Sequence, residues 1–592
     1  MPGAVRSVVK CPLWGYGAKS LGSAFFSLGG EKIKRLTDAD EGEDVSGTPE
    51  YRPRHMKVAE APTKTEASTQ EQVGRSAALM SVLVIVSRLT GFLRTWGQAY
   101  AIGVTVMASC YSVANNLPNQ LYELVAAGML TTAFLPVYMS VRKRAGIEGA
   151  SEYTSNLVSI VLVLMGAVTV LGFIFAAELV YTQSFTATSE FDFDLTVYFF
   201  RFFVIEVVLY ALSSIFSGVL NAERDYFWGQ AAPIFNNFAT TASFLAYAFL
   251  ADKNPELALL ILAIGNPLGV ALQALLQLPP MLRHGICLRF RIDLRDPLLK
   301  ETLKIGVPSV AVMLMGFATT SVQSTASLSV TALGASVTYY ARLWYTLPYA
   351  ILTVPITTAM FTELSDSWAR GDDRGFREGI SSGMGQILFF MIPFALYLIV
   401  FSMPLVSVLA SGGFTAEALD MTASYLAVYS LSLPLYAVCM YLQKVASSMR
   451  RMGLYAWASA LGAVVQIWVQ LAYTTTFGLN FVAFSSLLFY VVIDGAMFVS
   501  LRRALGPLGL RSLFVSVLRT LALGAAGAGA GALILWGLTL TVGPCAGETL
   551  RSVLYCVLAG IPALVVTYGG ALLLKVPEAA TIGRLAGRLL HR

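Results

Sequence analysis

The sequence has few charged residues, and this shortage restricts what the chain can be. Only 13% of its 592 residues are Asp, Glu, Lys or Arg, whereas 56% are hydrophobic and the mean hydropathy is +0.66. Such a chain would be insoluble as a globule, and its composition is typical of a protein that crosses a membrane many times. The net charge of +6 lies mainly in short loops, so it indicates membrane topology and not nucleic-acid binding.

Residues that hold metals or carry acid–base chemistry are equally scarce. The three histidines, His55, His284 and His591, fall in predicted loops or tails. Six scattered cysteines show no CxxC spacing, so we interpret them as packing residues and not as disulfides or metal ligands. We therefore expect no catalytic residue, no metal and no cofactor.

Long apolar runs fill most of the chain. From Ser76 onward they recur with lengths of about 20 residues or more, enough to cross a hydrocarbon core of about 30 Å. We predict an all-α polytopic membrane protein with about 14 transmembrane helices, two six-helix lobes plus two extra C-terminal helices. The predicted spans are 76–101, 106–139, 155–181, 196–221, 229–250, 256–280, 300–328, 335–364, 380–409, 417–446, 453–476, 479–501, 512–541 and 551–575.

Composition and charge also predict the organisation of these spans. Residues 1–75 are rich in charge, Ser, Thr and Pro, which predicts a disordered cytoplasmic tail, and they lack the apolar core of a signal peptide. Basic clusters such as Arg142-Lys143-Arg144 and Arg450-Arg451 fall in alternate loops, so both termini are expected in the cytoplasm. The remaining predicted parts are an N-terminal lobe (76–280), a C-terminal lobe (281–505), helices 13 and 14 (506–575) and a cytoplasmic C-terminal tail (576–592).

Weak echoes relate the two lobes to each other. LPNQLYELVAAGMLTTAFLP in the second span has a counterpart in LPYAILTVPITTAMFTEL of the eighth, and residues 444–455 stand where 221–230 stand in the first half. We interpret the echoes as lobes in the same orientation, related by an axis along the membrane normal, with a site between them. In the thirteenth span, Gly527 and Gly531 indicate close helix packing.

Polar residues interrupt the first two spans. Arg88 and Arg94 lie in the first, and Asn115, Asn119 and Glu123 lie in the second. A charge at hydrocarbon depth costs several kcal/mol, so such residues normally face a bundle interior or a wet cavity, often for transport. A proline in the middle of the second span predicts a bend, which suits alternating access better than a passive anchor.

These two spans also carry a family resemblance. SRLTGFLR, followed by NNLPNQLYEL and AAGMLTTAFLPVY, resembles the opening helices of the MurJ (MviN) family, and VLNAERDYFWGQAAPIFNN resembles its fourth-to-fifth helix junction. The likeness covers about residues 76–575 in segment order. It implies a flippase for the lipid-linked peptidoglycan precursor lipid II, within the multidrug/oligosaccharidyl-lipid/polysaccharide exporter superfamily. For Gly527 and Gly531 the resemblance suggests a second interpretation, a groove that holds a lipid tail.

The resemblance implies a transporter and no enzyme, working by alternating access in the bacterial cytoplasmic membrane for cell-wall synthesis. Its implied partners are a lipid-linked pyrophosphate saccharide, membrane lipids and candidate cell-wall synthesis proteins. Arginine suits a pyrophosphate because its planar fork binds phosphate oxygens in pairs. The predicted substrate-binding residues are Arg88, Arg94, Asn115, Asn119, Glu123 and Arg342. The competing interpretation is that each arginine pairs with a carboxylate such as Glu123 or Glu206, or extends to an interface.

The sequence departs from the family at charged positions. Ser109 and Tyr122 replace an aspartate and an arginine of the family, and Arg342-Leu343 replaces an Asp-Arg pair, so part of the anion-binding set is lost. The resemblance to those family members that use sodium implies an ion held by carboxylates in the seventh and eleventh helices. Here the eleventh span has no acid, which leaves membrane potential or another cation, with Asp494 and Glu363 as weak ion-site candidates.

Alternative functions follow from the same features. The chain could flip another polyprenyl-linked saccharide or export amphipathic compounds. It could also be a transport-inactive scaffold for cell-wall enzymes, because the changes at Ser109, Tyr122 and Leu343 are those that decay would produce. A glycosyltransferase that uses Asp192 and Asp194 is least favoured, because these residues lie in a short loop without a soluble domain.

Overall fold

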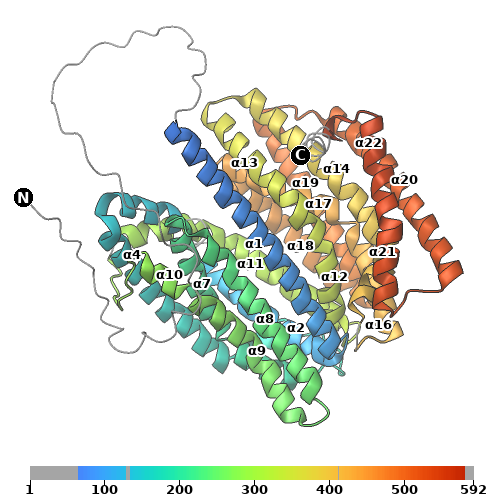
Figure 1. Cartoon of the computed structure of the whole chain (residues 1–592), viewed down its shortest axis with the longest axis horizontal. Coiled ribbons are helices and arrows are strands. Elements are labelled where there is room, and N and C mark those ends of the chain that lie inside the picture. Colours follow the sequence, from blue (N-terminus) through green and yellow to red (C-terminus); the bar gives the residue numbers. More distant parts are fainter. Residues whose placement is uncertain (1–63, 128–133, 296, 411–412, 580–592) are drawn as a thin grey trace, which may run out of the picture. The chain divides into compact units, whose positions relative to one another are not determined.

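The structure, a computed structural model, describes residues 64–127, 134–295, 297–410 and 413–579 (Figure 1). The chain divides into two units, Met1–Ser81 and Val82–Arg592. Of the first unit, only the beginning of helix α1 (Lys64–Ile102) is described. This helix begins ahead of the predicted start at Ser76, because residues 64–75 contain several good helix formers. The rest of the predicted N-terminal tail, and most of the C-terminal tail, lie outside the described residues.

The N-lobe is defined here as residues 82–283 and the C-lobe as residues 297–505. After α1, the N-lobe contains α2 (Val106–Tyr122), the π-helix η1 (Glu123–Ala127), α4 (Phe134–Ile174), α5 (Ala176–Thr182), α6 (Phe193–Phe203), α7 (Glu206–Ala222), α8 (Tyr226–Leu250), α9 (Pro255–Leu275) and α10 (Leu278–Arg283). The C-lobe contains α11 (Pro297–Leu328), α12 (Gly334–Pro348), the π-helix η2 (Tyr349–Thr353), α13 (Val354–Ala369), α14 (Asp373–Val400), α15 (Ser402–Leu409), α16 (Ala416–Ser430), α17 (Leu433–Ser448), α18 (Met452–Phe477) and α19 (Leu479–Leu505). Beyond it lie α20 (Leu510–Val542), α21 (Thr549–Leu564), η3 (Val565–Gly569), α22 (Gly570–Leu573) and η4 (Pro577–Ala579).

Helix is present in each of the fourteen predicted spans, and the described ranges contain no strand. Within those ranges, nine helices are long and apolar enough to cross a membrane, or ten if the bent pair α16 and α17 forms one span. The predicted class, an all-α polytopic membrane protein, is thereby confirmed. The count of fourteen spans and the exact domain boundaries stay predictions.

Each lobe has its own hydrophobic core. The N-lobe core is rich in aromatic side chains, among them Tyr111 and Phe203, and the C-lobe core contains Tyr340 and Tyr441. A few residues of one lobe pack in the core of the other; Ala99 of α1, for example, belongs to the C-lobe core. The lobes are therefore packed separately over most of their length, which leaves room for a site between them.

Three helices change to π-helical geometry close to a proline. Pro118 lies within α2 and precedes η1, Pro348 ends α12 immediately before η2, and Pro562 precedes η3. A proline lacks the N–H group that a helix needs, so the hydrogen-bond ladder shifts and the helix bends. The predicted distortion of the second span is thus present, and α12 repeats it in the C-lobe.

A second repeat lies at the turns after α7 and α17. Arg224 and Arg450 are both non-glycine residues with positive φ, 61° and 55°, and they are 226 positions apart. Each turn closes with the same hydrogen bond, from Asp225 N to Leu220 O (2.8 Å) and from Arg451 N to Ala446 O (2.9 Å). These shared turns support the interpretation that the lobes are two copies of one six-helix plan.

The two extra helices pack against the C-lobe, where α20 lies beside α14 (Figure 1). Helix α21 contacts α15. A side chain at Gly527 would collide with Thr567 and Ala563, and one at Gly531 with Phe401 and Ala563. Both glycines therefore allow close helix packing, which is the first of the two interpretations given for them above.

Candidate functional site

A polar cavity of about 280 Å³ lies between α2 of the N-lobe and α11 and α12 of the C-lobe. The N-lobe contributes three amides, Asn115, Asn116 and Asn119. The C-lobe contributes hydroxyl and amide groups of α11, such as Gln323, and the guanidinium of Arg342 on α12. Among the described lining residues Arg342 alone is charged, so the cavity is a neutral hydrogen-bonding wall opposite one positive charge.

The structure brings three of the predicted site residues together and separates the other three. Asn115, Asn119 and Arg342 line the cavity. Glu123, which is exposed on η1, lies close enough for its charge to act on Arg342. Arg94 and Arg88 do not line this cavity, and Arg88 is exposed on α1. The roles of all six residues stay predictions.

Behind the cavity wall, a buried hydrogen-bond network fixes the amides of α2. Asn266 on α9 donates from Nδ2 to Asn115 Oδ1 (2.6 Å) and to Glu206 Oε1 (2.9 Å). Glu206 is fully buried, and the positive charge of Arg94 acts on it. No direct ion pair joins Arg94 and Glu206 in the described part of the chain. The alternative stated above, that Arg94 pairs with Glu206, is therefore limited to an attraction over a longer distance.

Asn266 is the member of this site that the sequence reasoning missed. It follows a glycine and precedes Pro267 in the otherwise apolar helix α9. A polar amide beside a helix-bending proline within a predicted span was the available signal.

Several tyrosines lie in the neighbourhood of the exposed Arg342. They are Tyr429, Tyr490, Tyr436 and Tyr345. Tyr345 stacks on Tyr429 with ring centroids 3.8 Å apart, and its hydroxyl bonds to Ser432 Oγ (2.9 Å). Within the described residues no carboxylate forms an ion pair with Arg342, so its guanidinium is available to an anion.

The lobes touch each other at one end of the cavity. Ser109 Oγ accepts a hydrogen bond from Ser336 N (3.2 Å), and Thr186 N donates to Thr325 Oγ1 (2.8 Å). At the same end, the backbone of Gly103 approaches Gly413 so closely that a Cβ on Gly103 would lie 2.1 Å from the Gly413 carbonyl oxygen. The cavity is therefore sealed where the short loops between these helices meet.

The structure shows the surroundings of the three departures from the family pattern, of which one belongs to this seal. Ser109 is fully buried and takes part in the contact between the lobes. Tyr122 shares a hydrogen bond with Ser214 inside the N-lobe and does not line the cavity. Leu343 is half-buried and packs against the C-lobe core, next to the exposed Arg342.

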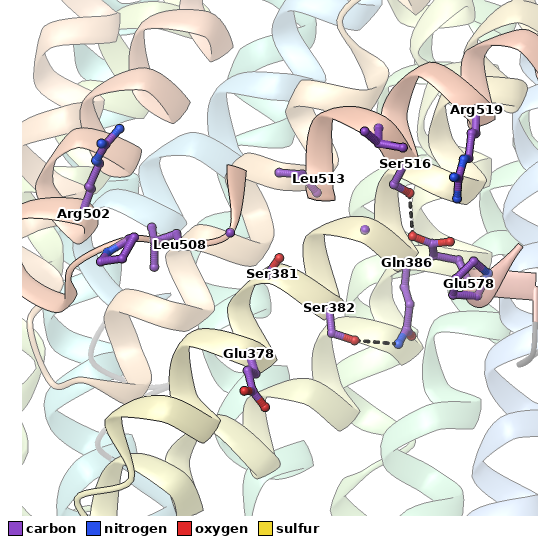
Figure 2. Close-up of a pocket in the computed structure, with 15 residues that line it drawn as sticks. Glu378, Ser381, Ser382, Gln386, Arg502, Leu508, Leu513, Ser516, Arg519 and Glu578 are labelled. Atoms are coloured by element: carbon purple, nitrogen blue, oxygen red, sulfur yellow. Dashed lines mark hydrogen bonds between the residues drawn. The ribbon is translucent and has the colours of Figure 1, made fainter. Parts of the chain in front are cut away.

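Two other cavities lie away from this site. The largest described one, about 1040 Å³, lies among α14, the turn before α20 and the region of Glu578, and it contains none of the predicted residues (Figure 2). There Ser516 donates to Glu578 (2.5 Å), while Arg502 and Arg519 line the rim. An apolar cavity of about 310 Å³ lies between α12 and α21 and is lined by residues such as Trp344 and Leu564.

The candidate ion-binding acids do not meet one another. Asp494 is buried on α19, and neither carboxylate oxygen has a hydrogen-bond partner in the described residues. Glu363 is exposed on α13. Asp192 caps the start of α6 by accepting from Leu195 N (2.9 Å), and the described residues hold no cluster of three potential metal ligands. The structure thus gives the Asp192 carboxylate a local structural task.

Comparison with known proteins agrees with the resemblance noted in the sequence. The sequence model of the family described as "Lipid II flippase MurJ" matches residues 98–544. A probable lipid II flippase MurJ of Borreliella burgdorferi is 24% identical over 435 residues, covering 72% of this chain and 83% of the relative. The lipid II flippase MurJ of Burkholderia cenocepacia is 25% identical over 365 residues, covering 61% of this chain and 70% of the relative.

Solved structures show the same fold. One described as "Lipid II flippase MurJ, inward closed conformation" superposes with a TM-score of 0.67 at 19% identity, covering 84% of this chain and all of that one. An inward-facing multidrug transporter of the MATE family gives 0.59 at 13% identity, covering 73% and 96%. At these identities the likeness concerns the fold alone.

Proposed function

Because the chain belongs to the lipid II flippase MurJ family and is a multi-pass membrane protein, we propose that it moves lipid II across the cytoplasmic membrane by alternating access. The observation that carries this proposal is the polar cavity between the lobes, in which the unpaired Arg342 faces the amides of α2. The reaction is transport, with no covalent bond made or broken.

The cavity suits the diphosphate part of such a lipid. The guanidinium of Arg342 offers a planar fork to phosphate oxygens, and the amides Asn116 and Asn119 offer donors from the other lobe. Since the donors come from both lobes, a bound diphosphate bridges them. A volume of about 280 Å³ lies at the lower limit of small-molecule sites, so the saccharide and peptide need the lobes to separate.

The apolar cavity between α12 and α21 suits the hydrocarbon tail. Its lining includes Trp344, Ile351, Phe401 and Leu564, with very little polar surface. Trp344 lies two residues after Arg342 on α12, so one helix borders both cavities. A diphosphate at Arg342 and a polyprenyl chain in the apolar cavity can therefore belong to one molecule.

The direction of transport follows from the seal and the charges of the loops. The sealed end lies at the loops with few basic residues, near Gly103 and Gly413, and we assign it to the outer face. Both termini then lie in the cytoplasm. Lipid II enters from the inner side, and release requires that the contacts of Ser109 and Thr186 break.

Complementation tests this proposal. The chain is expressed in a bacterium depleted of its own lipid II flippase, as wild type, Arg342→Ala and Arg201→Ala at matched membrane levels. Arg201 lies over the ring of Phe173 on the outside of the N-lobe and is the matched control. We expect rescue by wild type and Arg201→Ala and failure of Arg342→Ala. Failure of a well-expressed wild type would favour another polyprenyl-linked saccharide or a transport-inactive scaffold.

A further inference from the structure

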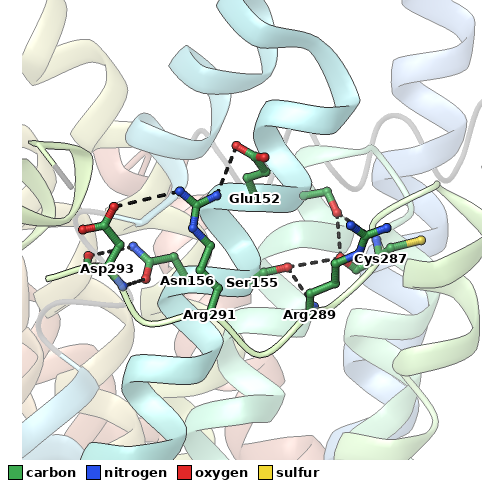
Figure 3. Close-up of polar contacts among 8 residues, drawn as sticks. Glu152, Ser155, Asn156, Cys287, Arg289, Arg291 and Asp293 are labelled. Atoms are coloured by element: carbon green, nitrogen blue, oxygen red, sulfur yellow. Dashed lines mark hydrogen bonds and ion pairs between the residues drawn. The ribbon is translucent and has the colours of Figure 1, made fainter. Parts of the chain in front are cut away.

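One segment joins the N-lobe to the C-lobe, from α10 to the start of α11. Between residues 286 and 293 it has no regular secondary structure and runs along α4 (Figure 3). We call residues 286–295 the linker. Nothing in the proposed transport cycle uses its side chains.

Backbone groups of alternate linker residues bind a row of serines on α4. The amide nitrogens of Cys287, Arg289 and Arg291 donate to the hydroxyls of Ser151 (2.9 Å), Ser155 (3.1 Å) and Ser159 (3.0 Å), respectively. Asp293 N continues the row by donating to Asn156 Oδ1 (2.8 Å). We call Ser151, Ser155 and Ser159 the serine ladder.

The spacing of the serines along α4 matches the spacing of alternate residues along the extended linker. Serines four apart on a helix rise by about 6 Å, and two residues of an extended chain advance by about 6.6 Å. Odd-numbered linker residues therefore turn their backbone toward α4 one after another. The linker is therefore held along α4 mainly by its backbone.

Exposed apolar and basic side chains alternate along the linker. The apolar ones are Phe290, Ile292 and Leu294, which are 72%, 47% and 66% exposed. Between and beside them stand the exposed Arg289 and Arg295, and neither forms an ion pair in the described part of the chain.

Arg291 differs from the other two arginines. It lies 3.4 Å from Glu152 and 3.9 Å from Asp293, so nearby carboxylates already engage it (Figure 3). The linker therefore offers three exposed apolar side chains and, as far as the described residues show, two guanidinium groups without a carboxylate partner.

The neighbouring part of α4 places the linker at the edge of the hydrocarbon core. Directly after Ser159, the helix exposes Leu162, Val163 and Leu164 on its surface, as a lipid-facing helix does. The linker itself belongs to the loops that carry clustered basic residues, which are the cytoplasmic ones. Alternating arginines and apolar residues at this depth match the phosphate and acyl layers of an anionic leaflet.

We propose that the linker is a binding site for anionic phospholipids of the inner leaflet. Phe290, Ile292 and Leu294 enter the acyl region, and Arg289 and Arg295 bind headgroup phosphates. The occupant is a membrane phospholipid and not the transported lipid, so the proposal stands whether or not lipid II is the cargo. The unpaired charges support this choice over a protein partner, because the leaflet supplies the complementary charge.

Lipid titration of the purified full chain in detergent tests the charge part. Dioleoyl phosphatidylglycerol and dioleoyl phosphatidylcholine are titrated against wild type, Arg289→Gln/Arg295→Gln and the control Arg370→Gln/Arg374→Gln. The control removes two exposed arginines of another basic loop that pair with Asp366 and Glu378. We expect phosphatidylglycerol to bind the linker variant roughly tenfold more weakly, and the control and phosphatidylcholine binding to change less than twofold.

Equal losses of phosphatidylglycerol affinity in the linker variant and in the control variant would overturn the proposal. Soluble glycerophosphoglycerol is added as a competitor, because a site for free phosphates would be displaced by it and a lipid site would not. A nitroxide on Phe290→Cys, compared with labelled wild type, tests the apolar part without removing a charge. It should become shielded from water-soluble relaxation agents in phosphatidylglycerol nanodiscs, and continued exposure there would also overturn the proposal.

Discussion

Helices α2 and α12 form opposite walls of the cavity, and they break in the same way while carrying different chemistry. Each contains a proline, Pro118 or Pro348, and each continues into a π-helix. The wall from α2 presents neutral amides, whereas the wall from α12 presents one guanidinium among tyrosine rings. The bend is therefore common to both lobes, and the binding chemistry is specific to each.

Under the proposed function, the two walls divide the work of binding. On the N-lobe side, Asn266 ties Asn115 to the buried Glu206, so the Asn115 amide has a fixed direction. On the C-lobe side, Arg342 is exposed, and Glu123 is the carboxylate whose charge acts on it. One wall supplies directed hydrogen bonds and the other supplies charge.

The largest effect on transport is expected when the positive charge of Arg342 is removed. We expect Arg342→Ala to lower lipid II transport in proteoliposomes about 10- to 100-fold, since a hydrogen bond to a charged group contributes about 1.5–3 kcal/mol. Arg342→Lys keeps the charge without the planar fork and should retain part of the activity. Equal activity of the Ala and Lys variants would contradict a role for the charge.

The contact that joins the two lobes is the next target. Gly103→Ala would place a Cβ 2.1 Å from the Gly413 carbonyl oxygen, so the sealed end should open and outer-face cysteine labelling in the cavity should rise several-fold. Gly478→Ala is the matched control, because Gly478 also has a positive φ but no atom within 4 Å of the added Cβ. If both variants label alike, backbone strain and not the lobe contact is responsible.

Loss of the N-lobe network should cost stability. Asn266→Ala leaves Asn115 and Glu206 without a buried donor, for which we expect a loss of about 1–3 kcal/mol in the free energy of unfolding. Gln98→Leu serves as the contrast, because the buried Gln98 amide has no hydrogen-bond partner in the described residues. Its replacement should be neutral or stabilising, as judged by thermal unfolding in detergent.

The smallest expected effect concerns a difference between the two repeated turns. Glu223 precedes the positive-φ Arg224, whereas Met449 holds the equivalent position before Arg450. Burial raises the pKa of Glu223, but hydrogen bonds from Arg142 and Tyr138 outweigh it and hold that pKa below its ordinary value. A carboxyl with a lowered pKa in the folded state stabilises the protein above its unfolded pKa, and this contribution is lost as pH falls through the folded pKa.

Thermal unfolding between neutral pH and pH 3 measures this contribution. We expect Glu223→Gln to lower the melting temperature by a few degrees at neutral pH and to flatten its acid dependence. Met449→Gln is the control in the other lobe and should leave the acid dependence unchanged.

Local patterns in the sequence predicted the fold class, and they singled out three residues that line the cavity between the lobes. Apolar runs predicted the helices, a proline predicted the distorted second span, and isolated polar residues predicted that Asn115, Asn119 and Arg342 belong to a chamber. The π-helices and the bond from Asn266 to Asn115, which spans 151 positions, could not be predicted. Such contacts depend on how the helices pack, and no period along the chain encodes them.

The same limit applies to Ser109. Sequence reasoning treated it as a lost anion-binding residue, because only the family pattern gave it a meaning. The structure gives it a partner 227 positions away, at the seal between the lobes. A charged residue that has been replaced can mean lost function or a new packing contact. The residue that packs against the replaced position decides between the two, and the sequence does not identify that residue.

The contact between the linker and α4 also sets the length of a tether between the lobes. Asp293 is bound to α4 through Asn156, and α11 begins at Pro297. Four peptide steps reach at most about 14 Å. While the bond from Asp293 to Asn156 holds, the start of α11 cannot move farther than this from its anchor on the N-lobe. A wider separation of the lobes at this point therefore requires the linker to detach from α4.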